Sequence, residues 1–193
     1  MRALIVLAHP LPESFAHEAT RRIEAALTRR GLAVDLLDLY AEGFDPVLSA
    51  AERRAYLDTS PDPEPPFAER VRAAQKLALV FPQWWFGFPA ILKGFFDRTL
   101  VSGVAYEREP DGRFTPLLTQ LDAFWAVTST GSPWWYARLI AGDPTRRLLT
   151  RGVKPQLCPR ARFRLIQVNG MDAMTREKGA AQLRRIEREF TRF

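Results

Sequence analysis

The residues best suited to chemistry lie in a short aromatic segment near the middle of the chain. Residues 82 to 89 read Pro-Gln-Trp-Trp-Phe-Gly-Phe-Pro and directly follow a buried apolar run. Four aromatic side chains this close together cannot all pack inward, and large exposed apolar groups usually indicate a ligand or a partner. A flat tricyclic ring such as a flavin suits this segment, because backbone N–H groups can bond its carbonyl edge while an aromatic side chain covers it. An aromatic core cluster or a dimer contact is the alternative, chiefly for Phe88 and Trp84.

Two polar segments follow other apolar runs. His9 and Ser14 lie between the first apolar run and a predicted helix, whose free N–H groups and positive potential suit a phosphate. The plainer interpretations are a helix cap for Ser14 and a backbone-bonded histidine for His9. Residues 128 to 132 read Thr-Ser-Thr-Gly-Ser, and their small size lets the backbone approach a ligand closely. Tyr136 could donate a hydrogen bond to a ligand atom on which negative charge develops. The alternative is that this segment is a polar loop whose tryptophans lie in an interface.

Composition narrows the classes of protein that fit. At 47% hydrophobic and 26% charged residues, the 193-residue chain is typical of a soluble globular protein. Its single cysteine, Cys158, excludes an internal disulfide, and with two histidines it leaves too few soft ligands for zinc. The net charge of +6 is spread along the chain without a dense basic tract, so no nucleic-acid partner is expected. Neither a Gly-x-Gly-x-x-Gly after the first apolar run nor a Walker sequence occurs.

The elements that must position these segments alternate between strands and helices. Short apolar runs predict strands over residues 3–8, 33–39, 77–81, 122–128 and 162–168. Helical spacing predicts helices after Ser14, around 67–76, from Pro89 and over 175–191. The proline-rich stretch 43–66 is expected to be irregular, with at most one short helix at a capping box, Ser49 to Glu52.

This alternation predicts one domain over residues 1–193, an α/β fold of the flavodoxin-like type. We expect a five-stranded parallel sheet in the order 2-1-3-4-5, with helices on both faces. Ligands of such sheets bind beyond the carboxyl ends of the strands, so the loops after the first, third and fourth strands should carry the function. The first apolar run is too short for a signal peptide or a membrane span, which predicts a cytoplasmic protein without membrane insertion.

With these three loops identified, the chain resembles the NAD(P)H:quinone oxidoreductase family. This flavodoxin-like group contains DT-diaphorase, modulator-of-drug-activity reductases and ancillary oxidoreductases of potassium-efflux systems. The most specific likeness is Phe81-Pro82, then Trp85-Phe86-Gly87, then the string from Pro89 to Arg98. Supporting matches are Ala8-His9, Ser14-Phe15, Asp38-Leu39-Tyr40, Ala105-Tyr106 and the segment from Thr128 to Gly131. The likeness spans residues 3 to about 143 and fades beyond residue 150.

The resemblance implies a bound flavin, FAD or alternatively FMN, with NAD(P)H as co-substrate. The residues implied to contact its phosphate and ribityl region are His9, Ser14 and Phe15, and those implied to hold its isoalloxazine are Pro82, Gln83, Trp84, Trp85, Phe86, Ser129, Thr130 and Gly131. Tyr136 matches a tyrosine that helps the reduced flavin exchange a proton. A histidine that shares this task in the family is replaced by Ala141, and Ala16 stands where many members have asparagine.

The activity implied by the resemblance is a ping-pong reaction. NAD(P)H delivers hydride to the flavin and leaves, and a quinone or similar small acceptor then takes the electrons at the same face. The family also implies a homodimer with the active sites between the subunits. The alternative is a flavin-binding ancillary subunit of a membrane transport system with little catalytic role. A one-electron carrier fits less well, because such carriers are usually acidic and this chain is basic.

Overall fold

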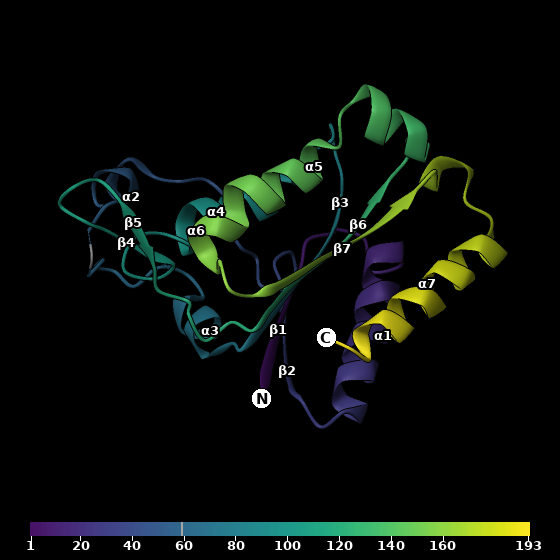
Figure 1. Ribbon diagram of the computed structural model, residues 1–193, viewed down its shortest axis with the longest axis horizontal. Helices are drawn as coiled ribbons and strands as arrows, with labels where there is room; N and C mark the ends of the chain where they lie inside the picture. Colours follow the sequence, from purple (N-terminus) through teal and green to yellow (C-terminus); the bar gives the residue numbers. More distant parts are fainter. Residues whose placement is uncertain (59) are drawn as a thin grey trace.

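A five-stranded parallel sheet forms the centre of the computed structural model, which describes residues 1–58 and 60–193. Its strands are β1 (Arg2–Leu7), β2 (Ala33–Asp38), β3 (Lys76–Pro82), β6 (Ala123–Thr130) and β7 (Arg162–Asn169). They lie in the order β2-β1-β3-β6-β7, and each neighbouring pair is parallel (Figure 1). This order is the 2-1-3-4-5 arrangement expected from the sequence, so the flavodoxin-like fold is confirmed.

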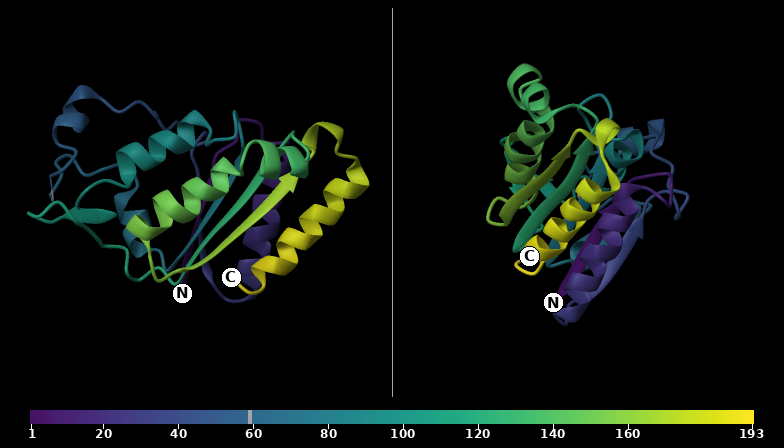
Figure 2. Two further views of the ribbon diagram at one scale, coloured as in Figure 1. Left: turned by 45° about the horizontal axis from the view of Figure 1, so that its top comes forward. Right: turned by 90° about the vertical axis from the view of Figure 1, so that its right-hand side faces the viewer.

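Helices cover both faces of the sheet (Figure 2). One face is covered by α1 (Phe15–Arg29) and α7 (Arg176–Phe190), which pack against each other. The other carries α3 (Ala68–Ala73), α4 (Ala90–Thr99) and an unbroken helical stretch made of α5 (Pro144–Arg147), η2 (Leu148–Val153) and α6 (Lys154–Leu157). Among the described residues, no helix combines the length and the apolar character that crossing a membrane requires.

The alternation of side chains along each strand divides the core into two layers. Successive side chains of a strand point to opposite faces, so Leu4 and Val6 of β1 join the layer beneath α4, while Ile5 and Leu7 join the layer beneath α1 and α7. β3 is buried along its whole length, as a central strand covered on both faces requires. The apolar runs of the sequence are therefore continuous because helices cover both faces of the sheet.

Several elements differ from the sequence-based expectation. The helix expected around residues 67–76 is the shorter α3, because Phe67 has a positive φ of 58° at its start and Ala74 is already extended before β3 begins at Lys76. The short helix α2 (Ala50–Arg54) does begin at the capping box of Ser49 and Glu52. Thr59, in the stretch expected to be irregular, lies outside the described residues.

Two regions hold structure that the sequence analysis did not predict. β4 (Tyr106–Arg108) pairs with β5 (Phe114–Pro116) in a separate antiparallel hairpin. Beyond β6, the turn η1 (Tyr136–Ile140) precedes the helical stretch α5 to α6, and η3 (Met171–Ala173) follows β7. The hairpin strands are only three residues long, and η1 has an irregular helical period, so neither produces a clear periodic pattern.

Candidate functional site

A cleft of about 520 Å³ opens at the carboxyl ends of the strands. This volume lies within the range of small-molecule and cofactor sites. Its walls are formed by His9, Phe15, Ala16, Pro82, Gln83, Trp84, Trp85, Phe86, Ser129, Thr130, Gly131, Ser132, Met171 and Asp172. The loops after β1, β3 and β6 thus meet at one place, as the position of ligand sites in parallel sheets predicts.

The loop after β3 forms a tight turn with an unusual backbone. The amide of Gly87 donates to the carbonyl oxygen of Trp84 at 3.0 Å, and the two residues between them, Trp85 and Phe86, have φ angles of 52° and 58°. Positive φ at both central positions is typical of a type I′ turn and is uncommon for residues other than glycine. Such strain persists where surrounding structure enforces it, and it is concentrated at ligand sites.

Contacts from neighbouring segments hold this turn in place. The amide of Gln83 donates to the carbonyl oxygen of Ser129 at 2.7 Å, which joins the loop to the end of β6. The buried Thr145 hydroxyl donates to the carbonyl oxygen of Phe86 at 2.9 Å. The Trp85 side chain has no such support and is completely exposed. The backbone of the turn is therefore fastened while one large aromatic ring remains free to contact a ligand.

Gln83, in the wall of the cleft, carries an unpaired buried donor. This side chain is only 8% exposed, and its Nε2 has no hydrogen-bond partner within the described part of the chain. An unsatisfied buried polar group costs about 1–3 kcal/mol. If this amide turns toward the cleft, a ligand with a carbonyl oxygen or a ring nitrogen at this wall would satisfy that donor.

Gly131 lets the opposite wall close tightly. A Cβ atom at this position would overlap the carboxylate of Asp172, which follows β7. Both residues line the cleft, and a carboxylate can accept hydrogen bonds from N–H or O–H groups of a ligand. The glycine thus allows an acceptor from another strand end to lie directly against the backbone of the β6 loop.

The N-terminus of α1 lies at the end of the cleft formed by the β1 loop. Phe15 and Ala16, the first residues of this helix, line the cleft, so its positive end faces the space inside. Ser14 is not among the lining residues. Its Oγ caps the helix by accepting from the backbone amide of His17 at 3.3 Å, which is the plainer of its two interpretations.

The two histidines near this helix end have different surroundings. His17 Nε2 lies 3.1 Å from an Asp38 carboxylate oxygen, and its Nδ1 lies 3.1 Å from Ser14 Oγ. His9 Nδ1 accepts from the backbone amide of Leu11 at 3.1 Å. Burial, and then the proximity of His17, lower the pKa of His9. The neutral ring of His9 therefore carries its proton on Nε2 and can donate to an anion.

Tyr136 lies at the margin of the cleft and is not one of its lining residues. Its ring stacks on Phe86 with 5.9 Å between centroids and an interplanar angle of 29°. Tyr136 is 40% exposed, and Ala141, the residue that follows η1, offers no group that could exchange a proton. Tyr136 is thus connected to the cleft through Phe86 and is open to solvent.

Four lining residues were not among those predicted to hold the flavin: Ala16, Ser132, Met171 and Asp172. The first two are neighbours of residues that were predicted. The other two belong to the loop after β7, and the rule that ligands bind beyond the carboxyl ends of strands also covers this loop. Applying it to the fifth strand would have identified Met171 and Asp172.

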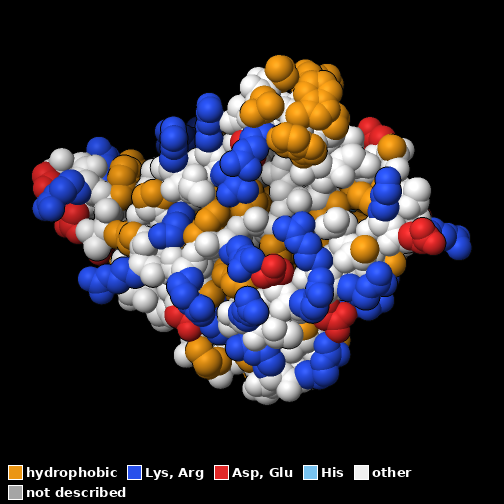
Figure 3. All heavy atoms as spheres, turned by 45° about the vertical axis from the view of Figure 1, so that its right-hand side comes forward, with side chains coloured by type: hydrophobic (Ala, Val, Ile, Leu, Met, Phe, Trp, Pro, Cys, Tyr) orange, Lys and Arg blue, Asp and Glu red, His pale blue; other side chains and the backbone are white. Residues whose placement is uncertain are grey.

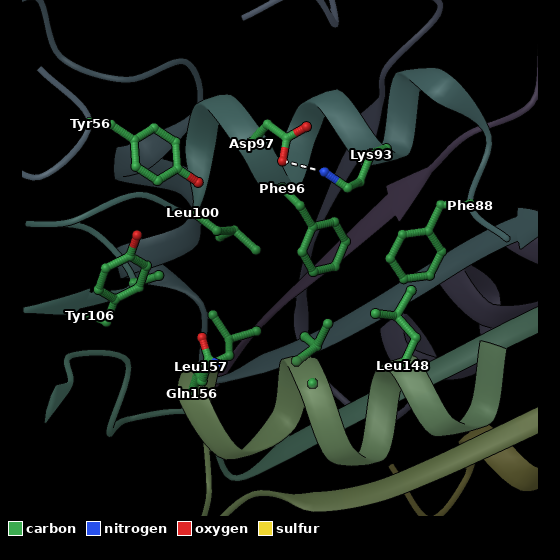
Figure 4. Close-up of a pocket in the computed structure, with 13 residues that line it drawn as sticks. Tyr56, Phe88, Lys93, Phe96, Asp97, Leu100, Tyr106, Leu148, Gln156 and Leu157 are labelled. Atoms are coloured by element: carbon green, nitrogen blue, oxygen red, sulfur yellow. Dashed lines mark hydrogen bonds and ion pairs between the residues drawn. The ribbon is translucent and has the colours of Figure 1, made fainter. Parts of the chain in front are cut away.

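A second, smaller cavity of about 220 Å³ lies between α4 and the η2–α6 stretch (Figure 4). Phe88 and Phe96 occupy its apolar part, and the hydroxyls of Tyr56 and Tyr106 point toward each other at one end. Burial and the neighbouring Tyr56 raise the pKa of Tyr106 to about 12. This cavity shares no lining residue with the cleft at the strand ends.

Comparison with known proteins agrees with this architecture. A family model described as flavodoxin-like fold matches residues 1–188. An uncharacterized NAD(P)H oxidoreductase of Haemophilus influenzae is 40% identical over 111 residues, which are 56% of this chain and 55% of the relative. The human ribosyldihydronicotinamide dehydrogenase [quinone] is 31% identical over 170 residues, 77% of this chain and 71% of the relative.

A solved structure extends the likeness over nearly the whole chain. The NAD(P)H:quinone oxidoreductase from Methanothermobacter marburgensis is 26% identical, with a TM-score of 0.83 over 99% of this chain and 98% of that one. By sequence, the chain spans about half the length of the first curated relatives that it matches, such as NAD(P)H dehydrogenase [quinone] 1 of Cavia porcellus at 45%.

Proposed function

The chain belongs to the NAD(P)H:quinone oxidoreductase family, with its flavodoxin-like fold, and we propose that it uses a bound flavin to reduce a quinone or a similar small acceptor with NAD(P)H. The observation that carries this proposal is the cleft at the strand ends, which is lined by a strained aromatic turn, by Gln83 with its unpaired amide and by the N-terminus of α1. These groups match the ring and the phosphate of one flavin ligand.

The residues of the cleft divide into a phosphate end and a ring end. The N-terminus of α1 and the Nε2–H of His9 would bind the phosphate, because both offer donors to an anion. The turn from Pro82 to Phe86, the Gln83 amide and the backbone of Ser129 to Gly131 would hold the isoalloxazine. We propose FAD as this flavin; FMN is the alternative that extraction of the cofactor would reveal.

A bound flavin supplies the capacity to accept a hydride from NAD(P)H and to pass two electrons to a second substrate in turn. Reduction of a quinone to a hydroquinone takes two electrons and two protons. The hydride brings both electrons and one proton, so the second proton comes from solvent or from a side chain. Tyr136 is our candidate for this donor: Ala141 has no titratable group, and the Tyr136 hydroxyl lies on an exposed side chain next to Phe86.

We also propose that the chain forms a homodimer with the cleft near the interface. The fully exposed Trp85 side chain supports this, since a second copy over the open side would cover the ring and exclude water. A change of sedimentation coefficient with protein concentration tests this proposal. A monomer at all concentrations would contradict it.

The activity is tested on the purified protein. We expect a yellow protein from which acid extraction releases FAD, anaerobic bleaching by NADPH or NADH, and reoxidation by benzoquinone. Failure to bind either FAD or FMN would refute the proposal. Flavin binding without reduction by either nucleotide would instead favour the ancillary-subunit function.

A further inference from the structure

The wall of the cleft holds no fixed cation that could balance a ligand phosphate. Lys and Arg side chains far outnumber Asp and Glu on the face of the molecule shown in Figure 3, yet none of the described residues that line the cleft is Lys or Arg. Asp172 even adds a carboxylate to this wall. A phosphate at the N-terminus of α1 would meet backbone amides, the His9 ring and the partial charge of the helix. Any full positive charge must come from a side chain behind the lining residues.

His17, in the first turn of α1, is such a side chain. It is only 14% exposed, and its ring is held between two partners. Nε2 lies 3.1 Å from Asp38 Oδ2, and Nδ1 lies 3.1 Å from Ser14 Oγ. Asp38 Oδ1 accepts from two backbone amides of the turn after β2, at 3.1 and 3.2 Å, so the carboxylate itself is fixed in place. A continuous polar network therefore joins the end of β2 to the N-cap of α1.

The protonation state of His17 decides what the Ser14 hydroxyl can do. In the neutral ring Nε2 carries the proton, because the Asp38 carboxylate beside it can only accept, and Nδ1 then accepts from the Ser14 O–H. In the charged ring Nδ1 carries a proton as well and donates to Ser14 Oγ, which also accepts from the His17 amide at 3.3 Å. The Ser14 O–H is then free to donate to an anion at the end of the helix.

Protonation of His17 also balances a negative charge near the helix end. With a neutral ring, the Asp38 carboxylate is uncompensated and repels a phosphate; with a charged ring, the pair is neutral. The other titratable groups here are His9, whose ring centroid is 6.3 Å from that of His17, Glu13 in the preceding loop, and Glu18 on α1. The Glu18 carboxylate is already paired with two arginines of α1. His17 is thus the group of this network that can supply a full positive charge.

We propose that His17 is a positioning residue that gives the cleft its preference for a phosphorylated flavin. The phosphate favours the charged ring, and the charged ring frees the Ser14 hydroxyl to donate to the phosphate. Because the two events are linked, the phosphate contributes most to affinity at acidic pH, where histidine is charged. This role rests on the proposed flavin-binding function.

The test compares riboflavin, which has no phosphate, with FMN, in the unchanged protein and in His17→Gln. Glutamine keeps an amide that can donate to Asp38 but carries no charge. Flavin fluorescence gives the four dissociation constants at about pH 5.5 and again at about pH 8.5, on either side of the range in which histidine changes charge. The preference of the unchanged protein for FMN over riboflavin should exceed that of the variant about tenfold at the acidic pH and less than about twofold at the basic pH. Titration of the FMN phosphate itself cancels, because both proteins bind the same ligand.

Two further variants separate charge from shape and one histidine from the other. His17→Lys carries a charge at both pH values, so it should recover part of the preference for FMN and lose its pH dependence. His9→Asn should weaken FMN binding at both pH values and keep the pH dependence, because His17 is unchanged in it.

The possible outcomes distinguish this role from the proposed function. Equal FMN preferences in the unchanged protein and His17→Gln at both pH values would overturn the role of His17 and leave flavin binding standing. Equal losses of riboflavin and FMN affinity in His17→Gln would also overturn it, because they would show that the ring supports the shape of the cleft. If the unchanged protein bound neither flavin, the proposed function would be refuted together with this role.

Discussion

The loops that follow β3 and β6 leave neighbouring strands at the same edge of the sheet, and both are rich in aromatic residues, yet they have different surroundings. The β3 loop is fastened through Gln83 and Phe86 and lines the cleft. In the β6 loop, residues 129–132 line the cleft, but the tryptophans that follow point away from it to solvent.

The difference shows that aromatic composition does not by itself identify a binding wall. What separates the loops is the backbone: two positive φ angles and two hydrogen bonds from other segments direct the β3 loop into the cleft. The turn at Tyr136 to Ile140 has hydrogen bonds mainly within itself, such as Ala141 to Tyr136 at 2.9 Å. The strained turn at Trp85 and Phe86 thus lies in the wall of the cleft, in line with the concentration of strained backbone at ligand sites.

The largest effect is expected at Gly131, where the β6 loop meets the cleft. In Gly131→Ala, the new Cβ atom would overlap the Asp172 carboxylate and push it into the cleft, so flavin affinity should fall about 100-fold. Fluorescence quenching of free flavin measures this, with far-UV circular dichroism as the check on folding. Adding Asp172→Ala to this variant should raise its flavin affinity again by at least about tenfold. If the second change restores nothing, the overlap is not the cause.

Gln83→Met should have opposite effects on the free and the flavin-bound protein. Without flavin, removal of the unpaired buried amide should raise the free energy of unfolding by about 1 kcal/mol. Flavin affinity should fall about tenfold, because the hydrogen bond to the ligand is lost. Urea unfolding of the flavin-free protein and flavin titration give the two values. A free protein that is less stable than the original would show that Gln83 serves the fold and not the ligand.

Replacing one tryptophan in each loop compares the two regions directly. Trp85→Ala should lower flavin affinity about fivefold by removing a ring that covers the ligand, and Trp134→Ala should leave the affinity unchanged. Both side chains are exposed, so neither change should alter the free energy of unfolding by more than about 0.5 kcal/mol. Equal losses of affinity in the two variants would contradict the distinction between the loops.

Tyr136→Phe tests the proton donor at the margin of the cleft. Water can reach this exposed position and replace the hydroxyl, so quinone turnover should fall only about threefold, less than for a buried general acid. Stopped-flow measurement at several pH values separates this loss from a change in stacking, because phenylalanine keeps the contact with Phe86. An unchanged rate at every pH would exclude Tyr136 from the reaction.

The smallest effect is the pH dependence that His9 contributes to stability. Its pKa is lowered in the folded state, so the folded protein binds a proton less readily than the unfolded chain. This contribution is therefore complete above the ordinary histidine pKa of about 6.5 and is lost as the pH falls through the lower folded value. Urea unfolding of His9→Asn should show a weaker decline on acidification than the original chain. If both chains lose the same stability on acidification, groups other than His9 cause that loss.

Local patterns of the sequence were enough to predict the sheet and its order. Apolar runs such as residues 3–8 mark buried strands, and Ser14 caps α1 as its spacing indicates. Except for Ser14, the residues predicted to bind the cofactor line one cleft, because the ends of parallel strands meet at one edge. These features depend on short stretches of chain and on general rules of α/β folds.

Other features depend on contacts between distant residues, which leave no local pattern. Thr145 supports the carbonyl of Phe86 from 59 positions away, and Asp172 requires a glycine at Gly131. The sequence alone therefore determined which segments meet at the cleft, and the tertiary structure decided which side chains enter it, because orientation depends on backbone angles imposed by neighbouring segments.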